Sequence, residues 1–418
     1  MAQLSDDCFA FGGPMRTVAE TVALIRTRLL PVTETERVGL ALADGRVTSE
    51  VVMAGLPLPA FTNSAVDGYA VRGTDLPTDA PQAFALADRI QAGMAPSRPL
   101  APGETVRIFT GAPMPAGADT VFMQEDTVVD PSGRILLPPG LSPGANVRPA
   151  GEDVAPGRIV IASGHRLRPQ DVALLAALGQ TEVAVLRRVR VAVFSTGNEI
   201  VAPGDPLGPA QVYDSNRFML MAMLARLGCT VTDLGILADA AGPIADALAE
   251  AAANHDLILA SGGVSTGEAD HVKSAVEAVG SLTFWRVAIK PGRPVAMGVV
   301  KGAAFIGLPG NPVASFVTFA RIARPAILAL AGTQETALPA TPLRAAFAYA
   351  KKRGRREYVR VTLLEGADGV LEAHKFPREG AGLLSSLVDT DGLVELDEES
   401  AGTEVGATVA FIPYAALI

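Results

Sequence analysis

The sequence predicts a multidomain protein of α/β and β structure, organised around a central doubly wound α/β/α domain. Three observations lead to this prediction. Apolar β-prone segments alternate with amphipathic helical segments from about residue 188 to 332, which is typical of a parallel sheet with helices on both faces. Short β-prone runs punctuated by Pro and Gly fill two other stretches, residues 57–146 and 338–418. The length, 418 residues, is enough for about three domains by the usual prior.

The N-terminal part of the chain predicts a helical/β domain made of two separated segments, residues 14–56 and 147–186. A helix from Val18 to about Leu30 is preceded by a capping-box pattern and followed by Pro31. A second helix, 169–178, stops where Gly179 follows it. We expect the residues between these segments, 57–146, to be an inserted β domain of short strands.

The central domain, residues 187–337, and the C-terminal domain, residues 338–418, complete the prediction. The C-terminal stretch has short strands and Gly turns, which predict a small β barrel or sandwich. The central stretch predicts strands at 189–194, 230–237, 256–260 and 283–289, a hairpin at 295–299 and 303–306, and helices at 217–227, from about 243, at 269–279 and from 312 to about 330.

Composition excludes several classes of function. The formal net charge is −9 and the mean hydropathy is +0.31, so a non-specific nucleic-acid binder is not expected, since binding phosphates needs a basic surface. No window approaches the ~18 uninterrupted apolar residues of a membrane span. The N-terminus has no basic signal region, and Cys8 and Cys229 are the whole cysteine complement. We expect a cytoplasmic protein without nucleic-acid or membrane partners.

Residues with chemical potential gather where strands of the central domain end. Ligands of open α/β sheets bind outside the carboxyl ends of the strands. Acids follow the first three strands (Glu199, Asp239 and Asp270), Lys290 and Arg293 follow the fourth, and Asn311 follows the last. This convergence predicts a ligand site at one edge of the sheet.

The glycine-rich turns at this edge have two interpretations each. Residues 261–268 suit either a phosphate beside a helix start or an ordinary βα turn, and sequence texture does not choose between them. The stretch is neither a Walker A loop nor a Gly-x-Gly-x-x-Gly motif. In residues 308–312, Asn311 and Pro312 make a good helix start, which is compatible with an anion site at the same place.

Two clusters of cations could hold an anion. In the turn 290–294, prolines flank Lys290 and Arg293, and we favour anion binding there over a solvated turn. Only six of the 35 basic residues are lysines, so Lys290 is notable. The second cluster, 351–360, is weak support by itself, because runs of charge are usually solvated faces.

Turn acids are candidates for binding a hard cation such as Mg²⁺, which takes one or two carboxylates together with substrate phosphates. Isolated turn acids are more often caps or Asx turns. The candidates are Asp67, Asp153, Glu199, Asp239 and Asp270. The four histidines lack zinc spacing, and no nucleophile elbow or reactive Cys motif is visible.

Eight sequence runs together resemble one protein family. They are Asn63-Ser64-Ala65-Val66-Asp67-Gly68-Tyr69-Ala70, Thr110-Gly111-Ala112-Pro113, Gly151-Glu152-Asp153, Ser195-Thr196-Gly197-Asn198-Glu199, Tyr213-Asp214-Ser215-Asn216, residues 261–270, Lys290-Pro291-Gly292-Arg293-Pro294 and residues 308–313. In this order, and spanning nearly the whole chain, they resemble the MoeA-type molybdopterin molybdenumtransferases, which include the E domain of gephyrin.

The resemblance implies a reaction and an assembly. Adenylylated molybdopterin and molybdate would be the substrates and Mg²⁺ the metal, with AMP released and the molybdenum cofactor formed. The central domain would be the molybdopterin-binding domain. The family's elongated homodimer would place the active site between the α/β domain of one protomer and the terminal β domain of the other. Molybdopterin adenylyltransferase and molybdoenzyme maturation proteins are the candidate partners.

The resemblance also implies roles for individual residues. The catalytic set would be Asp67, Thr110, Asp153, Glu199, Asp239, Asp270, Lys290 and Arg293, of which Glu199, Asp239 and Asp270 would be the metal ligands. Asp67, Thr110 and Asp153 would come from the partner protomer. The substrate-binding set would be Ser195, Thr196, Gly197, Gly262, Gly263, Ser265, Gly267, Pro309, Gly310, Asn311, Pro312, Arg355, Arg360, Ser385 and Ser386.

Two other functions stay open on the sequence. The central domain is shared with molybdopterin adenylyltransferases, which act one step earlier, and gephyrin shows that the fold can serve as a non-catalytic scaffold. The acids and cations at the strand ends favour catalysis over a scaffold. The additional β domains and the turn at 290–293 favour the insertion of molybdenum over adenylylation.

Overall fold

Helix α1 (Val18–Arg28) opens the part of the chain that the computed structural model describes, residues 15–263, 271–292, 294–333 and 338–417. The predicted capping box is confirmed: the Glu20 backbone N–H donates to Thr17 Oγ1 (3.1 Å), and the Thr17 N–H donates to Glu20 Oε2 (2.8 Å). Val18 and Ile25 are buried in the core of the central domain. The first helix therefore packs on the central domain, although the rest of its segment lies elsewhere.

The segments before and after the inserted domain pair with each other. Strand β1 (Thr35–Gly39) runs antiparallel to β12 (Glu182–Leu186), and β2 (Val52–Met53) to β11 (Ile159–Ile161). Helix α2 (Pro169–Ala177) completes this unit, with Gly179 just after it at φ 74°. Two antiparallel strand pairs thus join the two segments to each other.

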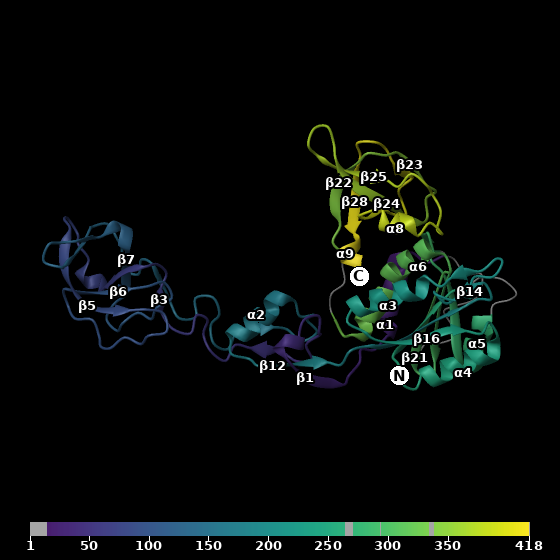
Figure 1. The fold of residues 1–418 in the computed structure, drawn as a ribbon, viewed down its shortest axis with the longest axis horizontal. Helices are drawn as coiled ribbons and strands as arrows, with labels where there is room; N and C mark the ends of the chain where they lie inside the picture. The colour runs from purple at the N-terminus through teal and green to yellow at the C-terminus, as the bar shows by residue number, and fades with distance from the viewer. Residues whose placement is uncertain (1–14, 264–270, 293, 334–337, 418) are drawn as a thin grey trace.

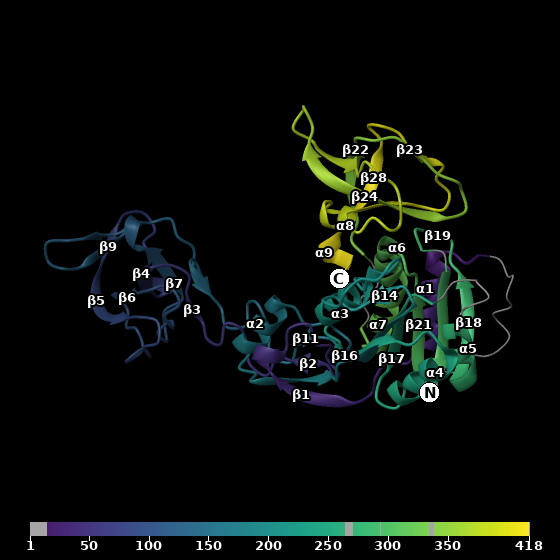
Figure 2. The same ribbon diagram turned by 45° about the vertical axis from the view of Figure 1, so that its right-hand side comes forward.

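The inserted domain is a six-stranded β structure at one end of the elongated molecule (Figures 1 and 2). Its strand order is β7-β4-β6-β5-β9-β8, over two small apolar clusters that include Ile108 and Phe122. A short pair, β3 (Asn63–Ser64) with β10 (Val147–Arg148), lies near the connection to the N-terminal unit. The strands are β4 (Gly68–Val71), β5 (Gln82–Ile90), β6 (Glu104–Ile108), β7 (Thr120–Met123), β8 (Val128–Val129) and β9 (Ile135–Leu137).

The central domain contains a six-stranded sheet of order β16-β13-β17-β21-β20-β18. The first four strands are parallel, β20 is antiparallel to β21, and β18 is antiparallel to β20. Strand β18 therefore runs in the same direction as the parallel strands, and its carboxyl end lies at the same edge. The strands are β13 (Arg190–Thr196), β16 (Thr230–Leu237), β17 (Leu257–Ser261), β18 (Gly280–Arg286), β20 (Pro294–Val300) and β21 (Ala303–Leu308).

Helices cover both faces of this sheet, so the doubly wound prediction is confirmed. Along β13, Val191 and Val193 pack on one face with Leu220 of α3, whereas Ala192 packs on the other with Ile244 of α4. This alternation follows from the period of two in a strand. The helices are α3 (Asn216–Arg226), α4 (Ala241–Ala251) and α5 (His271–Val279), and a small pair of strands, β14 (Ile200–Val201) and β15 (Val212–Tyr213), lies beside them.

One predicted strand, 283–289, is confirmed over 283–286 but ends earlier than predicted. The chain ends β18 at Arg286 and then forms a two-residue strand, β19 (Ile289–Lys290), in a different sheet. Strand β19 pairs in parallel with β24 of the C-terminal domain, with Lys290 opposite Glu357. The strand that pairs with Ile289 and Lys290 lies almost 70 positions later in the chain. A local sequence pattern carries no information about such a distant partner.

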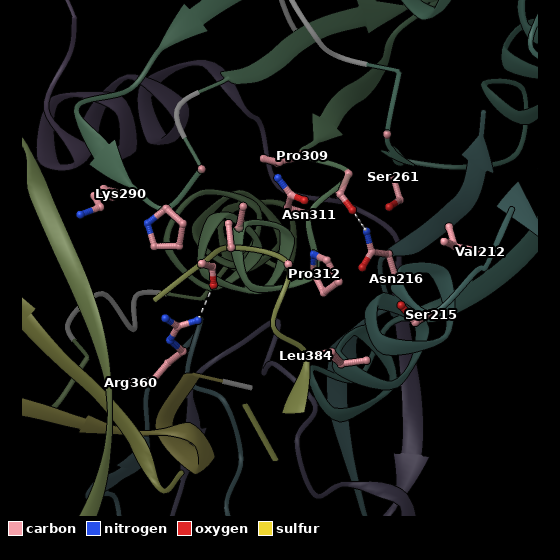
Figure 3. Close-up of a pocket in the computed structure, with 18 of the residues that line it drawn as sticks. Val212, Ser215, Asn216, Ser261, Lys290, Pro309, Asn311, Pro312, Arg360 and Leu384 are labelled. Carbon is pink, nitrogen blue, oxygen red and sulfur yellow. Dashed lines mark hydrogen bonds between the residues drawn. The ribbon is translucent and has the colours of Figure 1, made fainter. Parts of the chain in front are cut away.

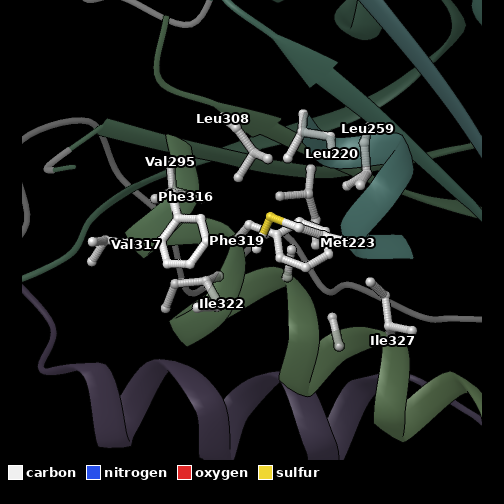
Figure 4. Packing of buried hydrophobic residues seen from close by; sticks show 14 of the residues in the cluster. Leu220, Met223, Leu259, Val295, Leu308, Phe316, Val317, Phe319, Ile322 and Ile327 are labelled. Carbon is white, nitrogen blue, oxygen red and sulfur yellow. The ribbon is translucent and has the colours of Figure 1, made fainter. Parts of the chain in front are cut away.

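The last helix of the central domain is continuous from Pro312 to Leu330, and it consists of α6 (Pro312–Thr318), a π-helical turn (319–323) and α7 (Arg324–Leu330). By length and composition this segment could cross a membrane, but 83% of its apolar window is buried inside the protein. Figure 4 shows Phe316, Phe319 and Ile327 packed against Leu220 and Met223 of α3. It is the core helix of the domain.

The C-terminal domain is a small closed β barrel. Its strands follow the order β24-β25-β22-β28-β26, and pairing of β26 with β24 closes the circle. Tyr358, Leu393 and Ile412 belong to the core of the central domain, so the two domains share one apolar cluster. The strands are β22 (Thr341–Ala345), β24 (Arg356–Glu365), β25 (Leu371–Lys375), β26 (Gly392–Leu396) and β28 (Thr408–Pro413), accompanied by β23 (Tyr349–Ala350), β27 (Gly402–Thr403), α8 (Ser385–Val388) and α9 (Tyr414–Leu417).

Candidate active site

A pocket of about 1020 Å³ opens where the carboxyl edge of the central sheet faces the C-terminal barrel. Figure 3 shows its two sides. Asn216, Ser215 and Ser261 lie on the side of the central sheet, and Lys290 and Arg360 lie on the side of the barrel. The pocket thus has hydroxyl, amide and carboxylate groups on the side of the central sheet and a concentration of cations on the side of the barrel.

The hydroxyl groups at the end of β13 are already hydrogen-bonded to acids. Ser195 Oγ donates to Asp214 Oδ1 (3.1 Å), and Thr196 Oγ1 lies 3.2 Å from Asp239 Oδ1, to which it donates. Asp239 stands behind Thr196 and does not line the pocket. Glu199 does line the pocket, and its side chain is exposed. Of the predicted acids at this edge that the structure describes, Glu199 therefore faces the cavity directly, whereas Asp239 is linked to the pocket wall by its hydrogen bond with Thr196.

The glycines after β17 allow a close approach between loops. A Cβ on Gly263 would lie 2.5 Å from Val272 Cγ2 and 2.8 Å from Thr196 Cγ2, and φ is 66° there. A Cβ on Gly310 would lie 3.8 Å from the Cα of Gly262, so the loops after β17 and β21 are neighbours. Bare backbone therefore forms this part of the pocket, which is compatible with either of the two interpretations of the loop.

Two asparagines border the glycine loops. Asn311 is the N-cap residue of α6, and Pro312 is in the first turn, but the Asn311 side chain makes no capping hydrogen bond. The side-chain part of the capping prediction is therefore wrong, and the exposed Asn311 amide lines the pocket instead. Asn216 Nδ2 donates to the Gly310 carbonyl (2.8 Å), while the buried Asn216 Oδ1 has no partner among the described residues.

The cation Lys290 is held by a cluster on the barrel. Its Nζ donates to the Tyr349 hydroxyl (2.9 Å) and to Glu357 Oε2 (3.1 Å), and the Tyr349 hydroxyl donates to the same carboxylate oxygen (2.7 Å). Arg355 Nε donates to Glu357 Oε1 (2.6 Å). Partial burial disfavours the charged ammonium, but its hydrogen bonds to Tyr349 and Glu357 outweigh that effect and raise the pKa of Lys290. Lys290 is therefore a fixed cation.

The second cation of the pocket, Arg360, is held by its own domain. Its Nη1 donates to the Gly380 carbonyl (2.7 Å) and to Ser386 Oγ (3.0 Å), and Ser386 is fully buried. Burial lowers the pKa of Arg360 from its usual high value, which still leaves the guanidinium charged at neutral pH. Lys375, paired with Glu379 (3.0 Å), and Arg378 also line this side.

Comparison with known proteins identifies the family. The family model of the MoeA N-terminal region (domains I and II) matches residues 16–179, that of the probable molybdopterin binding domain matches 192–329, and that of the MoeA C-terminal region (domain IV) matches 342–414. The chain belongs to the MoeA family. It is therefore a transferase of molybdenum cofactor biosynthesis.

Individual relatives are similar over nearly the whole chain. The molybdopterin molybdenumtransferase of Haemophilus influenzae is 38% identical over 91% of this chain and 94% of its own length. Molybdopterin molybdenumtransferase 2 of Mycobacterium tuberculosis is 36% identical, over 93% and 96%. A crystal structure of the molybdopterin biosynthesis MoeA protein of Pyrococcus horikoshii superimposes with a TM-score of 0.82 at 28% identity, covering 96% of this chain and all of that one.

The MoeA fold brings many of the predicted site residues together. Gly197, Asp239, Arg355, Ser385 and Ser386 do not line the pocket, although Asp239 and Ser386 hydrogen-bond to residues that do. Ser265, Gly267, Asp270 and Arg293 lie outside the described residues. Those that line it are Ser195, Thr196, Glu199, Gly262, Gly263, Lys290, Pro309, Gly310, Asn311, Pro312 and Arg360.

Three predicted residues lie far from this pocket. Asp67 and Thr110 are in the inserted domain, where the Thr110 N–H and hydroxyl both donate to Asp67 Oδ1 (2.8 and 2.7 Å) and lower the Asp67 pKa. Asp153 lies in the chain beside Leu58, to whose carbonyl its N–H donates. Figure 1 shows the inserted domain at the opposite end of the molecule from the barrel.

One chain of this MoeA-family protein supplies both walls of this pocket. The α/β wall and the terminal β wall of the pocket were expected to come from different protomers. Here Gly262 and Asn311 from the central domain, and Arg360 from the barrel, line one pocket within one chain. Since the two domains share a core, this pairing does not need a second copy.

Several lining residues were not predicted as site residues. They are Asn216, Tyr349, Lys375 and Arg378, together with Glu357 behind Lys290. Asn216 was visible as the start of a helix after an acid, and Lys375 as one of six lysines. Glu357 sits inside the basic run 351–360 as the one acid within it, and that position was the signal that could have found it.

Proposed function

We propose that this protein inserts molybdenum from molybdate into adenylylated molybdopterin and releases AMP. The observation that carries the proposal is the pocket with bare glycine backbone and helix start on one side and cations on the other. Phosphoryl groups suit free backbone N–H donors at a helix start, and an oxyanion suits Lys290 and Arg360. One pocket can therefore hold two anionic substrates side by side.

The chain's own residues supply binding and orientation. Lys290 places a positive charge at the pocket, and Arg360 adds a second one that is fixed by Ser386. Such preorganised charges stabilise developing negative charge more strongly in a partly buried site than in water. Ser215 and the exposed Asn311 amide offer neutral hydrogen-bonding groups to the substrate on the opposite side. No protein nucleophile is required by this arrangement.

The described residues fit a Mg²⁺ ion that is shared with substrate. Glu199 folds over Gly197, where an added Cβ would lie 2.8 Å from Glu199 Oε2, and Asp239 lies behind Thr196. No group of three or more acidic, His or Cys ligands occurs among the described residues, and Mg²⁺ commonly takes only one or two carboxylates plus phosphate oxygens. Glu199, which lines the pocket, would hold the ion, and Asp239 would support the site through its hydrogen bond with Thr196. When bound, the ion would neutralise the anions and polarise a phosphoryl oxygen.

We further propose a cytoplasmic homodimer. Asp67 and Thr110 form a hydrogen-bonded pair on the inserted domain, away from the pocket of their own chain. A second copy in a two-fold arrangement could bring that pair to the pocket. An adenylyltransferase that supplies the adenylylated substrate, and molybdoenzyme maturation proteins that receive the product, would be the partners.

The experiment is an assay of the purified chain with adenylylated molybdopterin, molybdate and Mg²⁺, with AMP release and active cofactor as the two readouts. We expect both to appear together and to depend on molybdate. A scaffold would yield neither. An adenylyltransferase would instead consume ATP with molybdopterin, and either of these results would contradict the proposal.

A further inference from the structure

We propose that Glu357, together with Tyr349, is a positioning residue for Lys290 in this pocket. The inference deepens the proposed function and rests on it. Glu357 lies behind the pocket wall and does not line the cavity, so it acts through the lysine and touches no substrate.

The contact between Lys290 and Glu357 joins a partly exposed strand residue to a buried carboxylate. The Glu357 side chain is only 1% exposed, whereas Lys290 is 43% exposed and reaches into the pocket. Both Glu357 oxygens are occupied, one by Arg355 and the other by Tyr349 and Lys290. A buried carboxylate that is hydrogen-bonded on both oxygens is fixed in place, and it therefore fixes the group that donates to it.

The backbone of Lys290 is fixed as well. Strand β19 places Lys290 opposite Glu357 in the parallel pairing with β24. On the other side, Thr318 Oγ1 of α6 donates to the Gly292 carbonyl (3.5 Å), and a Cβ on Gly292 would collide with Thr318. The backbone at Lys290 and Gly292 therefore packs between α6 on one side and strand β24 of the barrel on the other.

This arrangement leaves one N–H donor of the Lys290 ammonium for a ligand in the pocket. An ammonium has three N–H donors, and Tyr349 and Glu357 take two of them. One donor remains for an anion in the pocket. The Tyr349 ring also lies under Nζ, with 5.5 Å between Nζ and the ring centroid. The lysine can therefore offer its charge and one hydrogen bond from a single position.

A competing interpretation is that Glu357 merely fastens the two domains together. Glu395 provides the matched control, because it also links them: its Oε2 lies 3.1 Å from Arg321 Nη2 of the central helix and its Oε1 accepts from Arg356. Glu395 does not line the pocket or contact Lys290. A purely adhesive role predicts the same behaviour for both acids.

The test compares Glu357→Gln, Tyr349→Phe and Glu395→Gln with the wild-type chain in the molybdate-dependent AMP-release assay. For Glu357→Gln we expect kcat to fall about tenfold or more, because misplacing a reacting group by about 1 Å costs up to ~100-fold. The KM for molybdate should change less than about threefold, since the positive charge of Lys290 remains. Tyr349→Phe should show a smaller fall in kcat, and Glu395→Gln should keep the wild-type kcat.

The pH dependence of kcat distinguishes the two interpretations, because a residue that only holds the two domains together would not change it. The titratable groups around Lys290 are Tyr349 and Glu357 in direct contact, with Arg355, Lys375, Glu379 and Arg360 farther out. Without the Glu357 charge, partial burial would dominate and the lysine would lose its proton more readily. The alkaline limb of kcat should then move to lower pH in Glu357→Gln and stay in place in Glu395→Gln.

Three outcomes would overturn the positioning role: a wild-type kcat in Glu357→Gln, equal falls in kcat for Glu357→Gln and Glu395→Gln, or an unmoved alkaline limb. A further fall in kcat when Glu357→Gln is added to Lys290→Gln would also contradict it, because the effect must pass through the lysine. If the wild-type chain releases no AMP, the proposed function itself fails, and that result is distinct from all of these.

Discussion

The two ends of this molecule are built on opposite principles. At one end the central and C-terminal domains share an apolar cluster that includes Tyr358 and Leu393, a strand pairing and the Arg321–Glu395 ion pair. At the other end the inserted domain has its own small clusters and joins the N-terminal unit through a narrow connection (Figure 2). We call the first the catalytic block and the second the arm.

The difference teaches where the pocket is complete and where it is not. In the catalytic block, both walls are set by buried contacts of one chain, so their relative position is part of the fold. The arm carries its candidate pair, Asp67 and Thr110, on a separate core. Because the pair lies far from the pocket of its own chain, any contribution that it makes to a pocket would have to come from a second copy.

Replacing Lys290 with Ala should have the largest effect, because it removes a fixed charge from the catalytic block. We expect AMP release to fall about 100-fold, the usual cost of losing one preorganised stabilising group. The folded state should survive, since the lysine is 43% exposed. Activity within about twofold of wild type would break the assignment of the cationic wall.

Replacing Gly263 with Ala should destabilise the catalytic block by about 2 kcal/mol, since the new Cβ would overlap Val272 and Thr196 in a well-packed loop. Gly93→Ala on the arm is the matched control: φ is also positive there (84°), but nothing lies within 4 Å of the added Cβ. Denaturant unfolding of both variants measures the difference. Equal losses would show that backbone strain alone, without the close approach, sets the cost.

Replacing Asp67 with Ala should lower activity about tenfold or more if the arm serves the pocket of a second copy. Mixing Asp67→Ala and Lys290→Ala chains then tests the assembly directly. Half of randomly assembled dimers would be mixed, each with one intact site, which restores about a quarter of wild-type AMP release by two-fold symmetry. Full inactivity of the mixture would place the arm's effect within its own chain, and full activity of Asp67→Ala would remove the arm from catalysis.

The smallest effect concerns the N-terminal unit between block and arm. The Arg168 hydrogen bond and the His165 contact hold the pKa of Asp171 far below its ordinary value of 3.8, despite its burial. A depressed carboxyl pKa stabilises the fold above the ordinary pKa, and that stability is lost as pH falls below it. Asp171→Asn should therefore cost about 1 kcal/mol at pH 7, discounted because Arg168 is exposed.

Thermal unfolding at several pH values measures this last effect. The difference in Tm between Asp171→Asn and wild type should be present at pH 7 and shrink as pH drops below about 4. A difference that persists unchanged at pH 3 would mean that the loss arises from packing and not from the carboxylate charge.

Much of the fold was predictable because it rests on local signals. The capping box at Thr17, the stop at Gly179 and the alternation of the central strands each follow from neighbouring residues. The gathering of Glu199, Lys290 and Asn311 at one sheet edge was also predictable, since parallel strands put their carboxyl ends together.

The failures have a common physical cause. The predicted strand 283–289 ends early, at Arg286, and Ile289 pairs instead with β24 from another domain. The Asn311 side chain does not cap its helix, although its residue type and position favour capping. Glu357 was hidden in a basic run, because its burial depends on Tyr349, Arg355 and Lys290 meeting across two domains.

The sequence by itself determined the order of the elements, the doubly wound centre, the two β domains and the edge at which a ligand would bind. These depend on periodicity, caps and turns, which act over a few residues. Only the tertiary structure decided that one chain supplies both walls of the pocket, that Lys290 is held by Glu357, and that Asp67 lies far away. Those facts depend on which buried surfaces fit together across distant segments, and no local pattern encodes that fit.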